Sequence, residues 1–283
     1  VVCCRTSGQV YCMKPWPEAK GKACDEQRHN SDMYHLWALI GTANVFRHTG
    51  DRGWLDQIWT GYTRGVMASL KKISHSGLMV VDQKADWARQ GQGGENIAAN
   101  ALLYGVLSDA VALGKAAGKP TAAFAAAKAH LFAAINGPES NLWDESKGSF
   151  RDNPTSQIHP QDGNSIAVWF KATTATRCAS ISTFLKGNWG EFGSSSPEWG
   201  NDIGTFPGSM EVNAHASIGD IAHTQRAVDL IKLQWGYMIN HPNGTQSTFW
   251  EGYHRDGSFA YQGIYMSHAH GWATGPASAL SQR

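Results

Sequence analysis

The feature of this sequence that most restricts its fold is a series of amphipathic segments with helical spacing, arranged in pairs. The first pair covers about residues 31–46 and 54–73, with Ser31 as a candidate N-cap and HTGDRG, 48–53, as the turn between them. In both segments apolar side chains recur with the helical period, which predicts helices that bury one face each. Further helices are predicted at about 95–117, 121–135, 164–172, 176–187, 209–218, 221–239 and 270–281. The pattern shows neither a strong βαβ alternation nor an exact repeat, so it predicts an all-α fold of helical hairpins.

Long loops rich in glycine, proline and aromatic residues separate the helix pairs, at about 74–94, 137–162, 187–208 and 240–268. The first of them contains a short extended run, GLMVV, at 77–81. Ordered loops of this length in a compact domain are usually functional. The polar candidates concentrate on them: Asp82, Asp86, Arg89, Glu95, Asp152, Gln161, Asp162, Glu191, Glu198, Asp202, Glu251, His254 and Asp256. In a toroid of hairpins these loops would meet at one end, and their carboxylates and aromatic rings would suit a neutral, hydroxyl-rich ligand.

Composition narrows the classes of partner. The 283 residues suffice for one large domain, which we expect at 31–283 after an irregular, cysteine-rich segment at 1–30. Lys and Arg number 24 against 23 Asp and Glu, a net charge of +1, so no nucleic-acid or membrane partner is expected. We also find no apolar run of the ~20 residues that a transmembrane helix needs.

The cysteines favour an oxidising compartment. Cys3, Cys4, Cys12 and Cys24 crowd into the start of the chain, which favours a disulfide-tied loop over a zinc site because no CxxC pair is present. Asn243-Gly244-Thr245 is an N-glycosylation sequon. Together these features predict a secreted, extracellular protein.

Glu251 is the first candidate for catalysis. It stands in STFWEGY, and an unpaired charge among aromatic rings is costly to bury. Neighbouring Phe249 and Trp250 would exclude water and raise the pKa of this carboxyl, which suits proton transfer. Glycoside hydrolysis commonly uses two carboxyl groups on opposite faces of one sugar bond, about 6.5–9.5 Å apart in an inverting enzyme. The alternative is a glutamate that points to solvent from a loop.

The second carboxyl group has several candidates. Asp86 in ADWARQGQGGEN lies beside Trp87 and three residues before Arg89, whose charge would lower the pKa of the aspartate and favour a binding or base role. Glu95 precedes a predicted helix and could instead stabilise its N-terminus. Asp82 and Asp162 are further options, although Asp162-Gly163 is also typical of a turn or cap.

Other chemistries have weaker support. His268 and His270 could face one side of a strand and bind a metal, but the sequence suggests no third ligand. P-loop, dinucleotide-binding and nucleophile-elbow motifs are not found in the sequence. We therefore expect neither a metal nor a cofactor.

Five stretches, taken in order, resemble one family. They are SDMYHLWALIGTANVFRHTGDRGWLDQIW, ADWARQGQGGENIAANALLY, HPQDGNSIAVWF, STFWEGYHRDGS and SHAHGWATGPASAL. Together they resemble fungal and bacterial α-L-rhamnosidase-like proteins of glycoside hydrolase family 78, the fungal type above all, from about residue 31 to the end. The resemblance implies an (α/α)₆ toroid, the six-hairpin glycosidase fold. It also implies an inverting hydrolase that releases terminal α-L-rhamnose from glycosides.

The resemblance also implies roles for single residues. Glu251 matches the family's general base, and Asp86 is the general acid or a sugar-hydroxyl ligand, with Glu95 as the other candidate acid. His270 and Trp272 resemble residues that line the site, and Trp87 and Trp250 resemble walls for the apolar face of the sugar. Asp82, Arg89 and Asp162 are further candidates for holding substrate.

The sequence leaves two questions open. Six hairpins require twelve helices and the pattern predicts about nine, so we expect the first helices of the toroid to be lacking. A second copy of the chain or a missing N-terminal segment would then cover exposed helix faces. The alternative function is a carbohydrate-binding, catalytically weak or inactive relative on the same barrel, and a six-hairpin enzyme for another sugar is a third.

Overall fold

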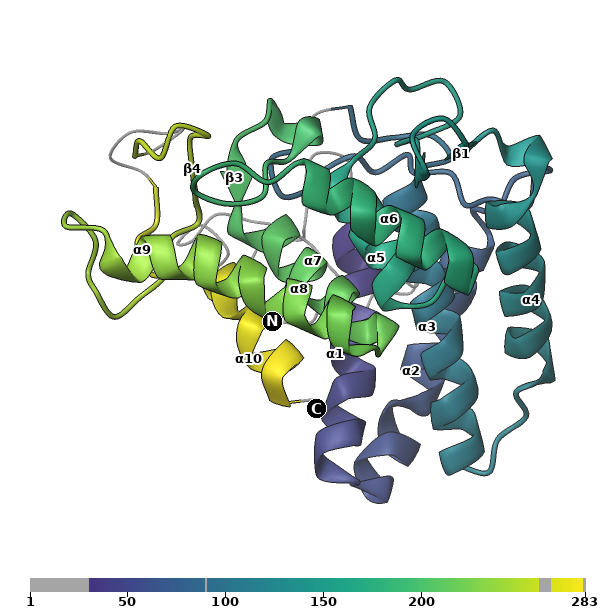
Figure 1. Ribbon diagram of the computed structural model, residues 1–283. Coiled ribbons are helices and arrows are strands. Elements are labelled where there is room, and N and C mark those ends of the chain that lie inside the picture. Colours follow the sequence, from purple (N-terminus) through teal and green to yellow (C-terminus); the bar gives the residue numbers. More distant parts are fainter. Residues whose placement is uncertain (1–30, 90, 260–265, 282–283) are drawn as a thin grey trace, which may run out of the picture. The chain divides into compact units, whose positions relative to one another are not determined.

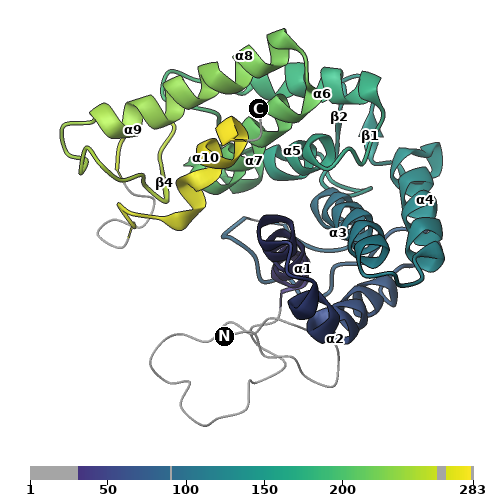
Figure 2. The same cartoon turned by 90° about the horizontal axis from the view of Figure 1, so that it is seen from below.

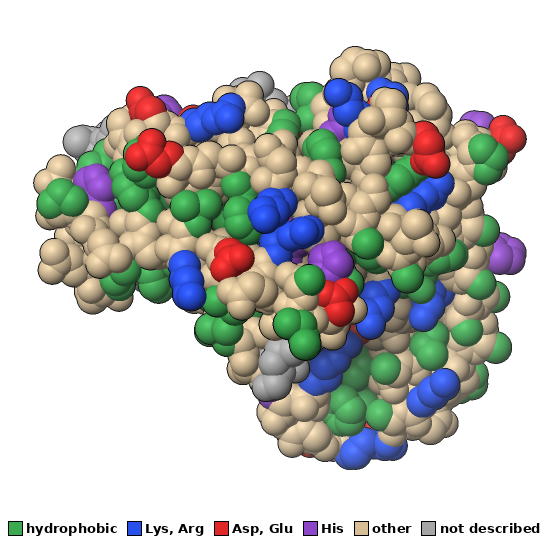
Figure 3. Space-filling model, in the orientation of Figure 1, with side chains coloured by type: hydrophobic (Ala, Val, Ile, Leu, Met, Phe, Trp, Pro, Cys, Tyr) green, Lys and Arg blue, Asp and Glu red, His purple; other side chains and the backbone are tan. Residues whose placement is uncertain are grey.

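The structure is a computed structural model that describes residues 31–89, 91–259 and 266–281. These residues form two compact units, with the boundary between Ser140 and Asn141. Both units are helical, and their few strands are short. On the face drawn in Figure 3, acidic and basic side chains are interspersed among uncharged ones, as the balanced composition predicts.

The described part of unit 1 is a bundle of four helices. They are α1 (Asp32–Thr49), α2 (Arg52–Leu70), α3 (Ile97–Ala116) and α4 (Ala122–Asn136), followed by the 3₁₀ turn η1 (Pro138–Ser140). Helix α3 packs against α1, α2 and α4, and most of its residues are buried (Figures 1 and 2). Among the described helices α3 alone is long and apolar enough to cross a membrane, but its burial is that of a core helix. The expectation that the chain has no membrane partner stays a prediction.

Side-chain caps explain where the helices of unit 1 begin. The Ser31 hydroxyl accepts a hydrogen bond from the amide of Tyr34 at 3.0 Å, which confirms it as the N-cap of α1. The carboxylate of Asp51 caps α2 by accepting from the amide of Trp54 at 2.9 Å. Helix α2 therefore begins at Arg52 rather than at residue 54, and the predicted turn shortens around Gly50, whose φ is +64°.

Unit 2 packs its helices around α7. Its elements are β1 (Trp143–Asp144), β2 (Ser149–Phe150), α5 (Gln161–Trp169), α6 (Ala175–Gly187), η2 (Pro197–Trp199), β3 (Ile203–Gly204), α7 (Thr205–Ile218), α8 (Ile221–Leu230), the π-helical turn η3 (Ile231–Trp235), α9 (Gly236–Asn240), β4 (Gly252–Tyr253), η5 (Gly271–Thr274) and α10 (Gly275–Ser281). Helix α7 is almost entirely buried and contacts α5, α6, α8 and α10. Helices α8 and α9 continue one another through η3 as one long rod (Figure 2). The strands form two antiparallel pairs, β1–β2 and β3–β4.

Two helices of unit 2 begin earlier than predicted because distant residues satisfy their first amides. Helix α5 begins at Gln161 rather than at 164, since the Glu198 carboxylate accepts from the amides of Gln161 at 2.8 Å and Asp162 at 2.9 Å. The first amides of a helix have no partner within the helix, and leaving them unpaired when buried destabilises the fold. An acceptor from elsewhere in the chain removes this penalty. Helix α7 likewise begins at Thr205 rather than at 209, with the Thr205 amide bonded to the carbonyl of Glu251.

One asparagine in each unit ties a helix to an extended segment in the same way. Each is fully buried and is the fourth residue of its helix, Asn100 in α3 and Asn164 in α5. Asn100 accepts from the amide of Met79 at 2.7 Å and donates to the carbonyl of Met79 at 3.0 Å. Asn164 pairs with the amide and carbonyl of Phe150 at 2.8 and 2.9 Å. The units thus share a structural device that the sequence does not display as a repeat.

The predicted secretion of the protein rests on the N-terminal cysteines and on the glycosylation sequon at Asn243. The four N-terminal cysteines lie outside the described residues, so the predicted disulfide-tied loop stays a prediction. Cys178, in the described part, is a free thiol in α6, and burial raises its pKa to about 11. Asn243 lies in an exposed turn that follows α9.

We expect Asn100→Ala and Asn164→Ala each to lower the free energy of unfolding by about 1–3 kcal/mol. Each change leaves a buried backbone amide and carbonyl without partners. Chemical denaturation of the full chain measures the effect. Asn44→Ala, at an exposed position of α1, is the matched control, and losses no larger than this control would contradict the role assigned to the two asparagines.

Candidate functional site

The backbone around Glu251 is fixed from two sides. Strands β3 and β4 pair Ile203 with Tyr253 and Gly204 with Gly252, so Glu251 lies directly before β4. The Glu251 amide donates to the carbonyl of Ser267 at 2.9 Å, and its carbonyl accepts from the amide of Thr205 at 3.2 Å. These bonds hold Glu251 at the N-terminus of α7.

The Glu251 side chain is anchored through one oxygen only. Its Oε2 accepts a hydrogen bond from the Ser267 amide at 3.2 Å, and the residue is half-buried. Among the described residues no donor bonds to Oε1. The carboxylate is therefore oriented by the backbone, and one oxygen is left for another partner.

Gly252 is required by the ring of Trp199. A Cβ atom at position 252 would lie 2.9 Å from Cη2 of Trp199 and 3.0 Å from the carbonyl oxygen of Ile203. Real Cβ atoms almost never approach so closely, so a side chain here would displace Trp199 or the β3–β4 pair. The glycine of FWEGY thus allows Trp199, at the end of the 187–199 loop, to pack beside Glu251.

The prediction that Trp250 forms a wall for a sugar is wrong. Trp250 is 0% exposed and packs in the core of unit 2, with its ring centroid 5.9 Å from Tyr237, 5.4 Å from Tyr253 and 4.6 Å from Phe259. No face of the ring is open to a ligand. Trp250 and Glu251, although adjacent in sequence, therefore have separate roles. Trp250 stabilises the core of unit 2, whereas the Glu251 side chain is only half-buried.

Two predicted site residues do lie on a segment next to Glu251. The His270 amide donates to the carbonyl of Phe249 at 2.9 Å, so the 267–272 segment runs beside 249–251. The His270 ring lies 4.3 Å from that of Trp272, and Trp272 stacks on Phe206 at 5.0 Å with planes 27° apart. Trp272 and Phe206 are only partly buried. The structure therefore brings Glu251, His270 and Trp272 into one region of unit 2.

Three of the predicted acidic residues lie in unit 1, in separate local networks. Asp82 pairs with Lys72 at 2.5 Å, and this hydrogen bond lowers the pKa of the Asp82 carboxyl. Asp86 accepts from the Trp87 amide at 2.9 Å and from the Gln92 side chain at 2.5 Å. Both carboxylates are thus held by neighbours within their own unit.

Glu95, the third, does not cap the helix that follows it. Its Oε1 accepts from the hydroxyls of Ser74 and Ser76, both at 2.7 Å, while Asn96 caps α3 through the amide of Ala99. The side-chain cap of α3 is therefore Asn96, and stabilisation of the helix N-terminus by the Glu95 charge stays a prediction.

Other predicted ligands of substrate are buried. Trp87 is 3% exposed, which contradicts its assignment as an open wall. Arg89 is also buried. Asp162 is 0% exposed in the first turn of α5, where its Oδ1 accepts from the Gly163 amide at 2.5 Å, so it belongs to a helix rather than to a turn.

The buried network that sequence reasoning missed centres on Glu211 of α7. Its Oε1 accepts from Trp189 Nε1 at 2.6 Å and faces His215 Nε2 at 3.2 Å. Its Oε2 accepts from the Ser194 hydroxyl and the Gln161 amide group, both at 2.7 Å. A carboxylate has about four acceptor sites, and here each has a partner. Glu211 thereby joins the 187–199 loop and the start of α5 to α7.

These partners decide the charge of Glu211. Burial alone would raise the pKa of this carboxyl, but hydrogen bonds from His215, Ser194 and Trp189 and the charge of His215 lower it below its usual value. The spacing of Glu211 and His215, four residues apart on one helix, was the only signal of the pair in the sequence.

Ser182, His215 and Glu211 form a hydrogen-bonded chain in the order found in serine hydrolases. The Ser182 hydroxyl lies 2.8 Å from His215 Nδ1, but it also accepts from Arg226 Nη1 at 2.7 Å. All three residues of the chain are 0% exposed. A nucleophile must be reached by substrate, so this chain is structural.

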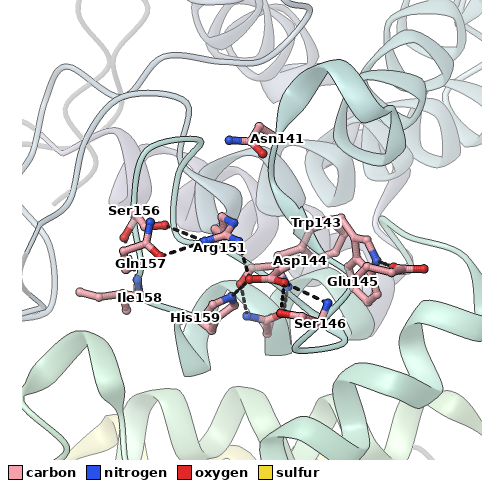
Figure 4. Close-up of polar contacts among 12 residues, drawn as sticks. Asn141, Trp143, Asp144, Glu145, Ser146, Arg151, Ser156, Gln157, Ile158 and His159 are labelled. Atoms are coloured by element: carbon pink, nitrogen blue, oxygen red, sulfur yellow. Dashed lines mark hydrogen bonds and ion pairs between the residues drawn. The ribbon is translucent and has the colours of Figure 1, made fainter.

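A second polar cluster surrounds Asp144 of β1 (Figure 4). The Asp144 carboxylate accepts hydrogen bonds from the backbone amide of Ser146 at 3.0 Å and from the Ser146 hydroxyl at 2.7 Å. It also accepts from the side chains of Arg151 at 2.5 Å and His159 at 3.1 Å. Hydrogen bonds from Ser146, with those of His159 and the charge of Arg151, lower the pKa of Asp144 to about 2 in spite of its burial. The cluster fastens the loop after β2 to the β1–β2 hairpin.

Metal ligands do not gather in the described part of the chain. There, no group of three His, Cys, Asp or Glu side chains could hold an ion. His268, one of the two histidines considered for metal, stacks on Phe259 at 4.9 Å.

We expect Asp144 to make stability depend on acid. Because its folded pKa lies below the usual value of 3.8, its contribution is present above about pH 4 and is lost as pH falls toward 2. In urea denaturation at several pH values, Asp144→Asn should therefore lose less stability than the wild type over this range. Asp229→Asn, at an exposed site on α8, is the control, and a wild-type slope in both variants would refute the assignment.

Comparison with known proteins shows the fold. Neither a protein-family model nor a curated protein matches the chain. Among solved structures, a rhamnosidase from Klebsiella oxytoca with rhamnose bound matches 98% of this chain with a TM-score of 0.76 at 18% identity. A family 78 rhamnosidase of Bacillus sp. GL1 matches 87% at 0.69 and 22% identity. A family 63 mannosylglycerate hydrolase from Thermus thermophilus, in complex with glucose, matches 99% at 0.65 and 10% identity.

The matched lengths differ among these proteins. This chain spans 51% of the Klebsiella protein, 26% of the Bacillus protein and 84% of the Thermus protein. None of the three is fungal, and the fungal type stays a prediction. The predicted fold class is confirmed: the chain has the all-α fold of the six-hairpin glycosidases.

Proposed function

We propose that this chain is the catalytic part of an inverting glycoside hydrolase that releases terminal α-L-rhamnose, with Glu251 as the general base. The observation that carries the proposal is the state of the Glu251 carboxylate. One oxygen is held by the Ser267 amide at 3.2 Å, and no donor among the described residues bonds to the other. A base that deprotonates water needs this combination of fixed orientation and an open oxygen.

The aromatic residues near Glu251 support a sugar as substrate. Trp272 and Phe206 stack on one another and are partly exposed, with His270 beside them. Such rings offer apolar contact to the C–H face of a sugar, while polar groups fix its orientation. The similar structures from Klebsiella and Bacillus are both described as rhamnosidases, which favours α-L-rhamnose as the sugar.

In this mechanism Glu251 takes a proton from water as the water attacks the anomeric carbon. A second carboxyl group protonates the oxygen of the leaving group. From the family resemblance we infer that Asp86 is this acid, with Glu95 as the other candidate. Secretion, favoured by the cysteines of the first segment, would place the enzyme where plant or microbial glycosides are found.

The alternative is a carbohydrate-binding relative that turns over little or no substrate. The same aromatic residues would serve it, and the chain would then hold sugar without consuming it. Saturable binding without release of product distinguishes this function from the first.

We expect the full chain to hydrolyse an aryl α-L-rhamnoside and Glu251→Gln to lower kcat by at least about 100-fold, because the amide cannot accept the proton of water. The initial sugar product, followed by NMR, should be the β-anomer, as inversion requires. Binding of rhamnose should change little, since the substitution keeps the size of the side chain.

Glu139→Gln is the matched control, because Glu139 is exposed on η1 and loses the same charge. It should retain full activity. Unchanged turnover in Glu251→Gln would refute the role of Glu251, and activity on other aryl glycosides but not on the rhamnoside would refute the sugar. Binding without turnover by the wild type would favour the alternative.

A further inference from the structure

The long rod of α8 and α9 is interrupted by a π-helical turn, η3, at Ile231–Trp235. The sequence predicts one regular helix over 221–239, and a π turn is less stable than the α-helix it replaces. Such turns are frequent at functional sites. Here the turn directs Gln234 and Trp235 into the interior, and both are buried.

Gln234 lies in a space made by two glycines. A Cβ atom at Gly208 would lie 2.6 Å from Gln234 Nε2, and one at Gly193 would lie 3.1 Å from its Oε1. The Gln234 side chain is 0% exposed and uses both ends of its amide. Nε2 donates to the carbonyl of Gly204 at 3.3 Å, and Oε1 accepts from the Ser194 amide at 3.4 Å.

The contact with Gly204 reaches the anchor of the candidate base. Gly204 is the residue of β3 that pairs with Gly252, immediately after Glu251. The next residue, Thr205, bonds to the Glu251 carbonyl through its amide at 3.2 Å and its hydroxyl at 2.9 Å. Gln234 therefore bonds to β3, the strand that pairs with β4 directly after Glu251.

The same π turn also holds the other part of the candidate site. Trp235 Nε1 donates to the carbonyl of Ala273 at 2.7 Å, and Ala273 follows Trp272 in η5. One turn of helix thus contacts both the strand beside Glu251 and the segment that carries the partly exposed ring of Trp272.

We propose that Gln234 is a positioning residue, which the π-helical turn presents to β3 so that the Glu251 carboxylate is held in the orientation required of a general base. This inference rests on the proposed function for its effect on catalysis. The effect of Gln234 on the backbone at Thr205 and Glu251 does not depend on the proposed function and is measured separately.

The first test replaces Gln234 with methionine in the full chain. Methionine keeps the volume of the side chain and removes both hydrogen bonds. We expect kcat toward the aryl rhamnoside to fall by up to about 100-fold with KM unchanged, since a small displacement of a catalytic group has effects of this order. The pH profile of kcat/KM should also shift, because the surroundings of the Glu251 carboxylate change. Gln225→Met, at an exposed position of α8, is the matched control.

Hydrogen exchange gives a readout that is independent of activity. In Gln234→Met the amides of Thr205 and Glu251 should exchange faster, while the core amides of α3 should not change. If the wild type does not hydrolyse any aryl glycoside, the proposed function fails, and exchange alone decides whether Gln234 fixes Glu251.

The second test is Gly208→Ala, which leaves Gln234 in place but displaces its amide. The three atoms nearest to the methyl group would all belong to the end of the Gln234 side chain, so the amide rather than the backbone is displaced. Gly236→Ala, in α9, meets nothing within 4 Å and is the matched control. We expect Gly208→Ala to reproduce the fall in kcat and the faster exchange. Values of kcat and exchange equal to those of the controls in both variants would overturn the proposal.

Discussion

The four-donor environment of the Glu211 carboxylate is the interaction on which the arrangement of unit 2 depends. A fully buried charge is costly unless its acceptor sites are filled, and here Trp189, Ser194, Gln161 and His215 fill them. The first two of these donors belong to the 187–199 loop, and the third begins α5. If this loop moved away from α7, the buried Glu211 carboxylate would lose the hydrogen bonds from Trp189 and Ser194. This constraint fixes the loop that ends in Trp199, and Trp199 in turn packs against Gly252 beside Glu251.

The same physical rule operates at other positions of the fold. The Glu198 carboxylate satisfies the first amides of α5, and Asn100 and Asn164 each pair with both backbone groups of one extended residue. Apolar burial stabilises the helices but would tolerate several registers between helix and loop. A buried polar group tolerates far fewer, because each alternative leaves donors or acceptors unpaired. The described 187–199 loop, which carries Ser194 and Glu198, is therefore long and ordered at once.

Much of the helical fold could be predicted from local pattern, and much of the site could not. The apolar period located the helices, and Ser31 was identified as a cap because its partner, Tyr34, lies three residues away. The starts of α5 and α7 were misplaced since their caps come from Glu198 and Glu251, far along the chain. Trp250 was misassigned because an aromatic residue beside a carboxylate has the same local sequence whether it faces a ligand or the core.

By itself, the sequence determined that the chain is helical and that its polar residues collect on long loops. These properties depend on spacing along the chain, which the period of the helix makes visible. Only the tertiary structure decided that Trp250 belongs to the core, that Glu211 is a buried charge with four partners, and that Gln234 supports the strand beside Glu251. The reason is that burial and hydrogen-bond partners are set by how separate elements pack, as when Glu211 of α7 meets Gln161 of α5 and Gln234 meets Ser194, and no local pattern encodes which of them will meet.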